Sequence, residues 1–423
     1  MTRITILSLL FVGLVSPGCV QLEEMNGADM NIPADVTRGE QTRHNIVVDK
    51  FQLWSDGVNL RGANLYQRRV YPVIDGSDFL GDGPIGPPVT QADFDELAAL
   101  GANYVNLSHP GLYSETPPYA VDADAQDNLD RLVTMAAKAG MFVMISFRTG
   151  PGRSEFAIFE GQDWFPQTLV NNSVWTDAKA QGAWSDMWAH TADRYRGNPA
   201  VIGFDLMVEP NGSSTVLGIW DPADFYPGRA ETLVDWNPMQ AAISAAIRAV
   251  DADTPILVSA MSYGSLDWLP SLKLTQPRSV ATVHHYEPFV FSHQNPRDGV
   301  SYPGRMNVDG VTLDVDRAWL ESLLAPLDEF RAKTGAPVAV NEFGVKRWAP
   351  GAATYFADQT SLFEKRGVNH ALWLWEASWK PLAEFDDFNF RHGPSSVNHE
   401  DVLDADLLAA IRANWSHNMA RPG

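Results

Sequence analysis

Eight short apolar runs, separated by longer amphipathic stretches, constrain the fold of this chain more than any other feature. Each run has the length of a strand, and strands that alternate with helices are typical of βα units around a parallel sheet. The runs cover residues 59–64, 103–107, 142–147, 202–208, 256–261, 281–286, 338–341 and 370–375. Eight such units in one chain predict an α/β fold, the (β/α)8 TIM barrel, formed by a single catalytic domain.

The stretches between the runs carry helical patterns and cover residues 91–100, 125–139, 177–195, 238–250, 316–333, 353–365 and 405–413. Thr90, with Asp93 three residues later, predicts a capping box at the start of the first stretch. Gly101 and Gly140 follow helical stretches, where a left-handed residue is favoured. The segment 289–312 is rich in proline and glycine, so we expect a loop above the active-site face.

The N-terminal residues predict export. Arg3 precedes the apolar stretch 4–15, which is too short to cross a bilayer and is typical of a signal peptide. The only cysteine of the chain, Cys19, follows a glycine. Residues 1–19 therefore resemble a bacterial lipoprotein signal, in which membrane attachment occurs only through a lipid on Cys19.

Export determines the expected location and the extent of the folded domain. We expect a secreted or outer-membrane, cell-surface lipoprotein, with plain secretion as the alternative. Residues 20–44 are polar and lack periodicity, so they predict a tether. The catalytic domain is expected over residues 45–416.

Composition narrows the partners. The 423 residues are 45% hydrophobic, which supports a large core, and their formal net charge is −21. A chain this acidic repels phosphate backbones, so nucleic acid is not an expected partner. The histidines show no metal-ligand spacing, and no glycine-rich phosphate loop is present. We expect a monomer with no metal and no cofactor.

Two of the apolar runs lead directly into a glutamate. Glu209 follows the run 202–208 and precedes Pro210, and Glu342 follows the run 338–341 and is followed two residues later by Gly344. A TIM barrel places its catalytic groups at the C-terminal ends of its strands. Two such carboxyl groups are what a retaining glycosidase needs, one as acid/base and one as nucleophile. An oligosaccharide or polysaccharide is therefore the expected substrate.

Five segments, taken in order, resemble glycoside hydrolase family 5, whose members include cellulases and mannanases with a retaining mechanism. The segments are 61–65, 194–207, 283–289, 340–344 and 372–376. The resemblance implies that Glu209 is the acid/base and Glu342 the nucleophile. It also implies that Tyr286 hydrogen-bonds the nucleophile, that His284 lies near the acid/base, and that Trp375 is the platform under the cleaved sugar.

Three positions depart from the family pattern. Val208 stands where an asparagine usually binds the sugar 2-hydroxyl, Asn106 stands where an arginine usually supports the nucleophile, and Arg148 stands where the third strand usually ends in histidine. We expect Asn106 and Arg148 to line the sugar site, with an arginine replacing the missing support for Glu342. His109, after the second strand, is a further candidate for sugar binding.

Several function hypotheses remain open at this point. The leading one is hydrolysis of a β-linked glucan or mannan. Arg68, Arg69, Arg148 and Arg153 fall on predicted active-face loops, and arginine suits carboxylate or sulfate groups. An enzyme for anionic or sulfated glycans, or an exo-acting one, is therefore the alternative. A carbohydrate-binding protein without activity is the third hypothesis.

Overall fold

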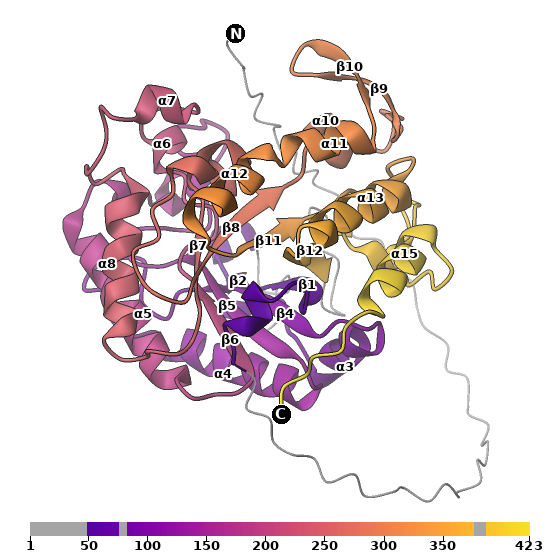
Figure 1. The fold of residues 1–423 in the computed structure, drawn as a ribbon. Coiled ribbons are helices and arrows are strands. Elements are labelled where there is room, and N and C mark those ends of the chain that lie inside the picture. Colours follow the sequence, from indigo (N-terminus) through magenta and orange to yellow (C-terminus); the bar gives the residue numbers. More distant parts are fainter. Residues whose placement is uncertain (1–48, 76–82, 376–385) are drawn as a thin grey trace, which may run out of the picture.

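Eight parallel strands form a closed barrel in the computed structural model, which describes residues 49–75, 83–375 and 386–423 (Figure 1). The strand order around the barrel is β1-β12-β11-β8-β7-β6-β5-β4. The strands are β1 Arg61–Tyr66, β4 Tyr104–Pro110, β5 Phe142–Thr149, β6 Val201–Asp205, β7 Ile256–Ser259, β8 Ser279–His285, β11 Val338–Phe343 and β12 Asn369–Trp375. The predicted TIM barrel is confirmed. The expected signal peptide 1–19, Cys19 and the tether 20–44 lie outside the described residues.

Helices surround the barrel (Figure 1). The longer ones are α3 Gln91–Ala99, α4 Ala123–Lys138, α5 Ala178–Tyr195, α8 Trp236–Arg248, α11 Arg317–Leu323, α12 Ala325–Thr334, α13 Ala352–Lys365 and α15 Asp406–Trp415. The predicted capping box is present, with the Thr90 N–H donating to Asp93 at 2.8 Å. The single helix expected over 316–333 is two helices, because Pro326 lacks an N–H and instead occupies the first turn of α12.

Shorter elements decorate the loops. They are α1 Gln52–Ser55, β2 Arg68–Arg69, α2 Pro72–Asp75, β3 Ile85–Gly86, α6 Gly212–Thr215, α7 Pro222–Phe225, α9 Met261–Gly264, α10 Phe289–Ser292, β9 Gly304–Val308 and β10 Val311–Val315. The 3₁₀ turns are Ala157–Phe159, Gln167–Leu169, Ser173–Trp175, Leu266–Ser271 and Phe390–His392.

The segment after β8 is more structured than expected. In place of an uninterrupted loop over 289–312, β9 and β10 form an antiparallel hairpin that projects beyond α10 and α11 (Figure 1). Its turn contains Asp309 and Gly310, both with positive φ. An Asp-Gly pair in this conformation is the turn that best matches the twist of two strands. This local signal could have predicted the hairpin.

The interior of the barrel is layered. At the N-terminal end, apolar side chains including Leu60, Tyr104 and Met144 pack on Trp54, whose indole N–H donates to the Ile202 carbonyl at 2.9 Å. Above them lies a buried polar layer made of Asn64, Asn106, Ser146, Asp205 and Asn341. These side chains bond one another, as buried polar groups must. The C-terminal mouth above this layer holds the site.

Among the residues that the structure describes, no helix combines the length and apolarity needed to cross a bilayer.

Candidate active site

Glu209 stands at the C-terminal mouth of the barrel, four residues beyond the end of β6. Its φ is 54°, in the left-handed region that residues other than glycine rarely adopt. The Val208 N–H, just before it, donates to the Phe147 carbonyl of β5 at 2.9 Å. Such backbone outliers cluster at functional sites.

Glu342 reaches the same mouth because β11 contains a bulge. From Val340 to Glu342, β11 advances two residues while its partner β8 advances one. Asn341 and Glu342 therefore both face inward. The Asn341 amide donates to Asp205 at 2.8 Å in the polar layer, while the Glu342 carboxylate lies above it. Re-aiming a side chain in this way is a common use of bulges next to active sites.

The two glutamates share one histidine. His284 Nδ1 lies 3.0 Å from Glu209 Oε1 and 3.3 Å from Glu342 Oε2. The Tyr286 hydroxyl donates to Glu342 Oε2 at 3.1 Å. One carboxylate oxygen of each glutamate and the histidine nitrogen all lie within 4.8 Å of one another. His285 faces the other side of β8 and lies 2.9 Å from Glu287.

The three titratable groups are electrostatically linked. Burial raises the pKa of Glu342, and the charge of Glu209 acts in the same direction. Burial also opposes ionisation of Glu209, but the hydrogen bond and charge of His284 outweigh it and lower the pKa of Glu209. Burial alone would lower the pKa of His284, yet the two carboxylates raise it. The protons of this cluster are therefore bound and released jointly.

Arg148, at the end of β5, contacts the other oxygen of Glu342. Its Nη1 lies 3.5 Å from Glu342 Oε1 and 3.2 Å from the Ser108 hydroxyl, and its Nε donates to Glu155 at 3.2 Å. The guanidinium also lies over the rings of Tyr66 and Trp373. Arg148 thus contacts Glu342 from the strand next to the one that carries Asn106.

Trp375 does not reach the site, so its assignment as the sugar platform is wrong. It is 1% exposed in the main apolar core, where its ring packs against Phe390, and the Arg391 guanidinium lies 4.1 Å from its ring centre. From Leu372 to Trp375, β12 advances three residues while β1 advances two. This irregularity ends the alternation of side chains, and Trp373 is the tryptophan that packs with Tyr66 and Tyr286 at the mouth.

Two other candidates also lie away from the sugar site. His109 is fully buried and faces outward from the barrel, with its Nε2 3.0 Å from the Asn128 side chain of α4. Asn106 lies in the polar layer below the glutamates, where it donates to Asn64 at 2.6 Å and accepts from Ser146 at 2.5 Å. Both side chains are occupied by internal hydrogen bonds, so neither contacts a sugar in this arrangement.

The four arginines of the active-face loops all have partners within the protein. Arg68 pairs with Asp75, and Arg69 pairs with Asp122. Arg148 contacts Glu155 and Glu342, as described above. Arg153 donates to the carbonyl oxygens of Val208 and Glu209. Three of the charges that motivated an anionic substrate are therefore paired with carboxylates, and the fourth is bound by backbone carbonyls.

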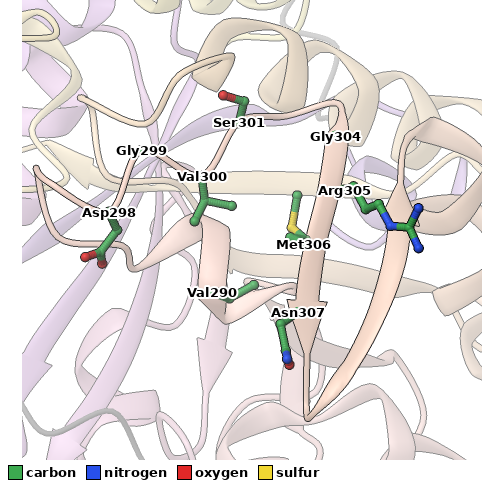
Figure 2. A pocket seen from close by; sticks show the side chains of 9 residues that line it. All are labelled: Val290, Asp298, Gly299, Val300, Ser301, Gly304, Arg305, Met306 and Asn307. Carbon is green, nitrogen blue, oxygen red and sulfur yellow. The ribbon is translucent and has the colours of Figure 1, made fainter.

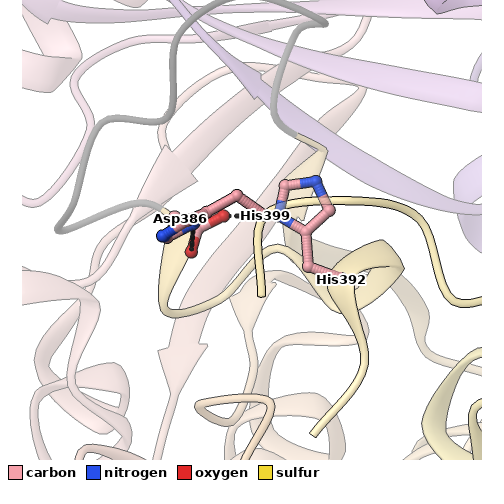
Figure 3. Close-up of side chains that lie close together, drawn as sticks. All are labelled: Asp386, His392 and His399. Carbon is pink, nitrogen blue, oxygen red and sulfur yellow. Dashed lines mark hydrogen bonds and ion pairs between the residues drawn. The ribbon is translucent and has the colours of Figure 1, made fainter. Parts of the chain in front are cut away.

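A second titratable cluster lies beside the mouth. The Asp386 carboxylate lies between His392, at 2.5 Å, and His399, at 2.9 Å (Figure 3). The buried Arg347 guanidinium also donates to it at 2.8 Å. Because this cation already neutralises the carboxylate, we interpret the cluster as structural. It holds the segment that carries Phe388, whose ring packs edge-on against Tyr286.

A surface hollow of about 490 Å³ lies between α10 and β9 (Figure 2). Asp298 and Arg305 lie at opposite sides of it, and the remaining lining is mostly small or apolar. The hollow contains none of the residues that contact the two glutamates.

Sequence reasoning missed Trp373, Tyr66 and Ser108 as neighbours of the site, and it placed Glu155 on a loop of the active face only as a substrate contact or a solvated group. The Tyr66 hydroxyl donates to Glu155 at 2.9 Å. Tyr66 and Ser108 are at or next to the C-terminal ends of their strands, which was the available signal. Glu155 follows a turn, and no sequence periodicity predicts where such a residue points.

Comparison with known proteins agrees with this geometry. The family model "Cellulase (glycosyl hydrolase family 5)" matches residues 63–378. Endoglucanase C of Acetivibrio thermocellus is 23% identical over 349 residues, which cover 74% of this chain and 90% of that protein. An endoglycoceramidase of Hydra vulgaris is 33% identical over 113 residues, 26% of this chain and 21% of that protein.

The fold has solved counterparts. The crystal structure of endoglucanase Cel5A from the hyperthermophile Thermotoga maritima superimposes with a TM-score of 0.58 at 19% identity, covering 86% of this chain and all of that one. At this identity the likeness concerns the fold.

Proposed function

The chain belongs to glycosyl hydrolase family 5, and from that membership we propose that it is a retaining glycosidase that cleaves β-glucan chains, with Glu209 as acid/base and Glu342 as nucleophile. The family establishes a glycosidase that hydrolyses O-glycosyl bonds. The retaining mechanism, the two roles and the substrate are our proposals.

The proximity of the two carboxylates carries the mechanism. Retaining enzymes hold these groups about 5–5.5 Å apart, whereas inverting enzymes leave about 6.5–9.5 Å for a water molecule. Here one oxygen of Glu209 and one of Glu342 lie within 4.8 Å. This spacing favours direct attack by one carboxylate on the sugar over attack by water.

The reaction then has two displacements. Glu342 attacks the anomeric carbon while Glu209 gives its proton to the glycosidic oxygen, and the leaving chain departs as an alcohol. Glu209 next takes a proton from water, the resulting hydroxide attacks the anomeric carbon, and Glu342 is released as a carboxylate. Tyr286 and Arg148 orient Glu342 through the contacts described above.

Proton supply to Glu209 involves His284. The present contacts favour the ionised form of Glu209 and a raised pKa for His284. A glycosidic oxygen bound against Glu209 removes water from that carboxyl and raises its pKa. We expect substrate binding to move the shared proton from His284 to Glu209, where the first displacement requires it.

Glucan is the favoured substrate because of the relatives. The relative from Acetivibrio thermocellus, which is matched over 90% of its own length, is named an endoglucanase. The internal pairing of Arg68, Arg69, Arg148 and Arg153 leaves an anionic or sulfated glycan with little support. A complete pair of glutamates likewise leaves little support for a binding protein without activity.

The decisive experiment is reducing-sugar release from a panel of cellulose derivatives, mixed-linkage glucan, mannan, xylan and sulfated polysaccharides. Wild-type protein is compared with Glu342→Gln. We expect activity on a glucan that falls by more than about 10³-fold in the variant, and a first-formed product with the β-anomer by NMR. A first-formed α-anomer would exclude retention, and full activity in the variant would exclude Glu342 as nucleophile. The chain length of the products distinguishes endo from exo action.

An amphiphilic β-glycoside is a second candidate substrate, supported by a specific observation. Phe289, beside Tyr286, is 45% exposed, and the neighbouring Val290 is also exposed. The endoglycoceramidase relative adds support over a quarter of the chain. Release of a lipid from a glycosylceramide, in the same assay and with the same variant, tests this candidate directly.

We also propose that the protein is exported and acts as a monomer, with a lipid on Cys19 as its only membrane attachment. The N-terminal sequence supports export. Mass spectrometry of the N-terminal peptide from cells measures the lipid, and loss of acylation in Cys19→Ala is the expected result. An unmodified N-terminus beginning elsewhere would indicate plain secretion.

A further inference from the structure

The end of β5 and the turn that follows it contact both of the proposed catalytic glutamates. We propose that Arg153, on this turn, is a positioning residue that holds the backbone of Glu209 in its reactive conformation. The inference depends on the proposed role of Glu209 as acid/base. It assigns a function to an arginine that touches neither the substrate nor the Glu209 carboxylate.

The guanidinium of Arg153 donates hydrogen bonds to two consecutive backbone carbonyls. Its Nη1 donates to the Val208 carbonyl at 2.7 Å and its Nη2 to the Glu209 carbonyl at 2.8 Å. Arg153 is only 5% exposed. A buried charge requires such partners, and the planar fork of arginine suits two acceptors held at fixed spacing.

The gripped backbone needs this support. Glu209 has a φ of 54°, a conformation that is unfavourable for a residue with a side chain and persists only where the surroundings enforce it. The Val208 N–H is held by the Phe147 carbonyl on one side. Arg153 supplies two further donors, so the backbone is held by hydrogen bonds from the Val208 N–H to the Glu209 carbonyl.

The turn itself is rigid. Gly150 and Arg153 exchange two backbone hydrogen bonds, at 3.0 and 2.9 Å. The Trp184 indole N–H donates to the Pro151 carbonyl at 2.7 Å. A Cβ at Gly152 would lie 2.7 Å from the Val174 nitrogen. The backbone of Arg153 is therefore held by hydrogen bonds and close packing, and its side chain connects it to Glu209.

The same turn connects to the nucleophile. Arg148, at the end of β5, contacts the Glu342 carboxylate, and Arg153, five residues later, contacts the Glu209 backbone. The relative placement of the two carboxyl groups thus depends on one short piece of chain. A displacement of about 1 Å at an active site can cost about 10²-fold in rate.

Leaving-group dependence tests the role of Arg153. A 2,4-dinitrophenyl β-cellobioside needs no acid to leave, whereas phenyl β-cellobioside does, so only the second reports on Glu209 in the first displacement. We expect Arg153→Met to lower kcat/KM for the phenyl substrate by about 10²-fold and for the dinitrophenyl substrate by less than about 10-fold. Arg153→Lys, which keeps the charge and one donor direction, should recover part of the loss.

Two variants serve as comparisons. Arg248→Met removes another arginine that donates to backbone carbonyls, those of Asp251 and Thr254, at the end of α8. It should leave the cleavage rates of both substrates unaffected. Arg148→Met removes a contact of the nucleophile and should lower both substrates alike. An equal loss on both substrates in Arg153→Met, or no loss, would overturn the proposal.

A measurement without substrate separates this inference from the proposed function. Amide hydrogen exchange, followed by mass spectrometry, should rise in peptides covering 206–212 in Arg153→Met and Arg153→Lys, and not in Arg248→Met. Unchanged exchange in the peptides covering 206–212 would refute the positioning role of Arg153, even if the wild-type protein cleaved neither cellobioside. Wild-type inactivity together with raised exchange would overturn only the proposed function.

Discussion

At the scale of single residues, the contacts of Glu342 define the site. Tyr286, His284 and Arg148 approach its two oxygens from two other strands. Each is a donor or cation, so together they favour the ionised form of Glu342 that the proposed attack on the sugar requires. Val208 offers no side-chain hydrogen bond in this environment, and its carbonyl is bound by Arg153.

The two tryptophans of β12 give a residue-scale prediction. Trp375 is buried in the main apolar core, so Trp375→Ala should lower the free energy of unfolding by roughly 3–5 kcal/mol. Trp373 lies at the mouth beside Arg148, so Trp373→Ala should lower kcat/KM roughly 10-fold or more through loss of stacking.

Urea unfolding and steady-state kinetics on both variants check this expectation. The pair has matched chemistry and differs only in location. If Trp375→Ala lost activity at wild-type stability, or Trp373→Ala were fully active, then Trp373 would not be the tryptophan that contacts the sugar.

At the scale of elements, small irregularities determine which side chains reach the mouth. The bulge in β11 brings Glu342 inward next to Asn341, and the shift in β12 separates Trp373 from Trp375. A regular strand points alternate residues to opposite faces. Two local departures from that rule therefore decide the composition of the site.

The start of α4 links helix stability to the β1 loop and gives an element-scale prediction. Asp122 caps the helix by accepting from the Ala125 N–H at 3.0 Å, and it also pairs with Arg69. Asp122→Ala should destabilise the protein by about 1–2 kcal/mol. Asp122→Asn keeps a capping oxygen and should cost less.

The pH dependence has a defined sign. Burial acts to raise the pKa of Asp122, but the hydrogen bond from the Ala125 N–H and the charge of Arg69 outweigh burial and lower this pKa. The charged form is therefore favoured in the folded state, and the stabilisation is lost as pH falls through this lowered pKa. Chemical denaturation at pH 7 and below pH 3 measures it. Equal stability of Asp122→Ala and Asp122→Asn at pH 7 would contradict the capping role.

At the scale of the whole molecule, three layers follow one another along the barrel axis. They are the apolar side chains around Trp54, the polar layer, and the mouth that holds the two glutamates. Asp205 sits in the polar layer, where it accepts from Asn341 and lies 3.2 Å from the Ser146 hydroxyl oxygen. Burial raises its pKa to about 7. The barrel thus holds a carboxyl group directly below the two glutamates.

Asp205 gives a prediction about the stability of the whole fold. Because the folded state binds its proton up to about pH 7 and the unfolded state only up to about pH 4, its contribution to stability falls as pH rises between these values. The decrease is at most roughly 4 kcal/mol, from 1.36 kcal/mol per pKa unit. Asp205→Asn should remove this part of the slope.

Urea unfolding at pH 5 and pH 7 measures the contribution of Asp205 to the pH dependence of stability. The difference in unfolding free energy between the two pH values should be smaller in Asp205→Asn than in the wild type. An unchanged difference would show that Asp205 is already ionised at pH 5 in the folded protein.

The sequence by itself determined the barrel and the two glutamates at its mouth. Strand and helix periodicities are local properties, and the end of a strand can be identified from neighbouring residues such as Pro210 and Gly344. The resemblance to the family implied His284 and Tyr286, and alternation along the strand pointed His285 away from them. These features need no knowledge of how distant segments pair.

Only the tertiary structure decided which tryptophan faces the mouth, where His109 and Asn106 point, and whether the arginines are free. Trp373 and Trp375 share one face by simple alternation, and only the register between β12 and β1 separates them. The partners of Arg69 and Arg153 are far along the chain. Strand register and long-range pairing depend on segments that folding brings together, so they cannot be predicted from the neighbouring residues in the sequence.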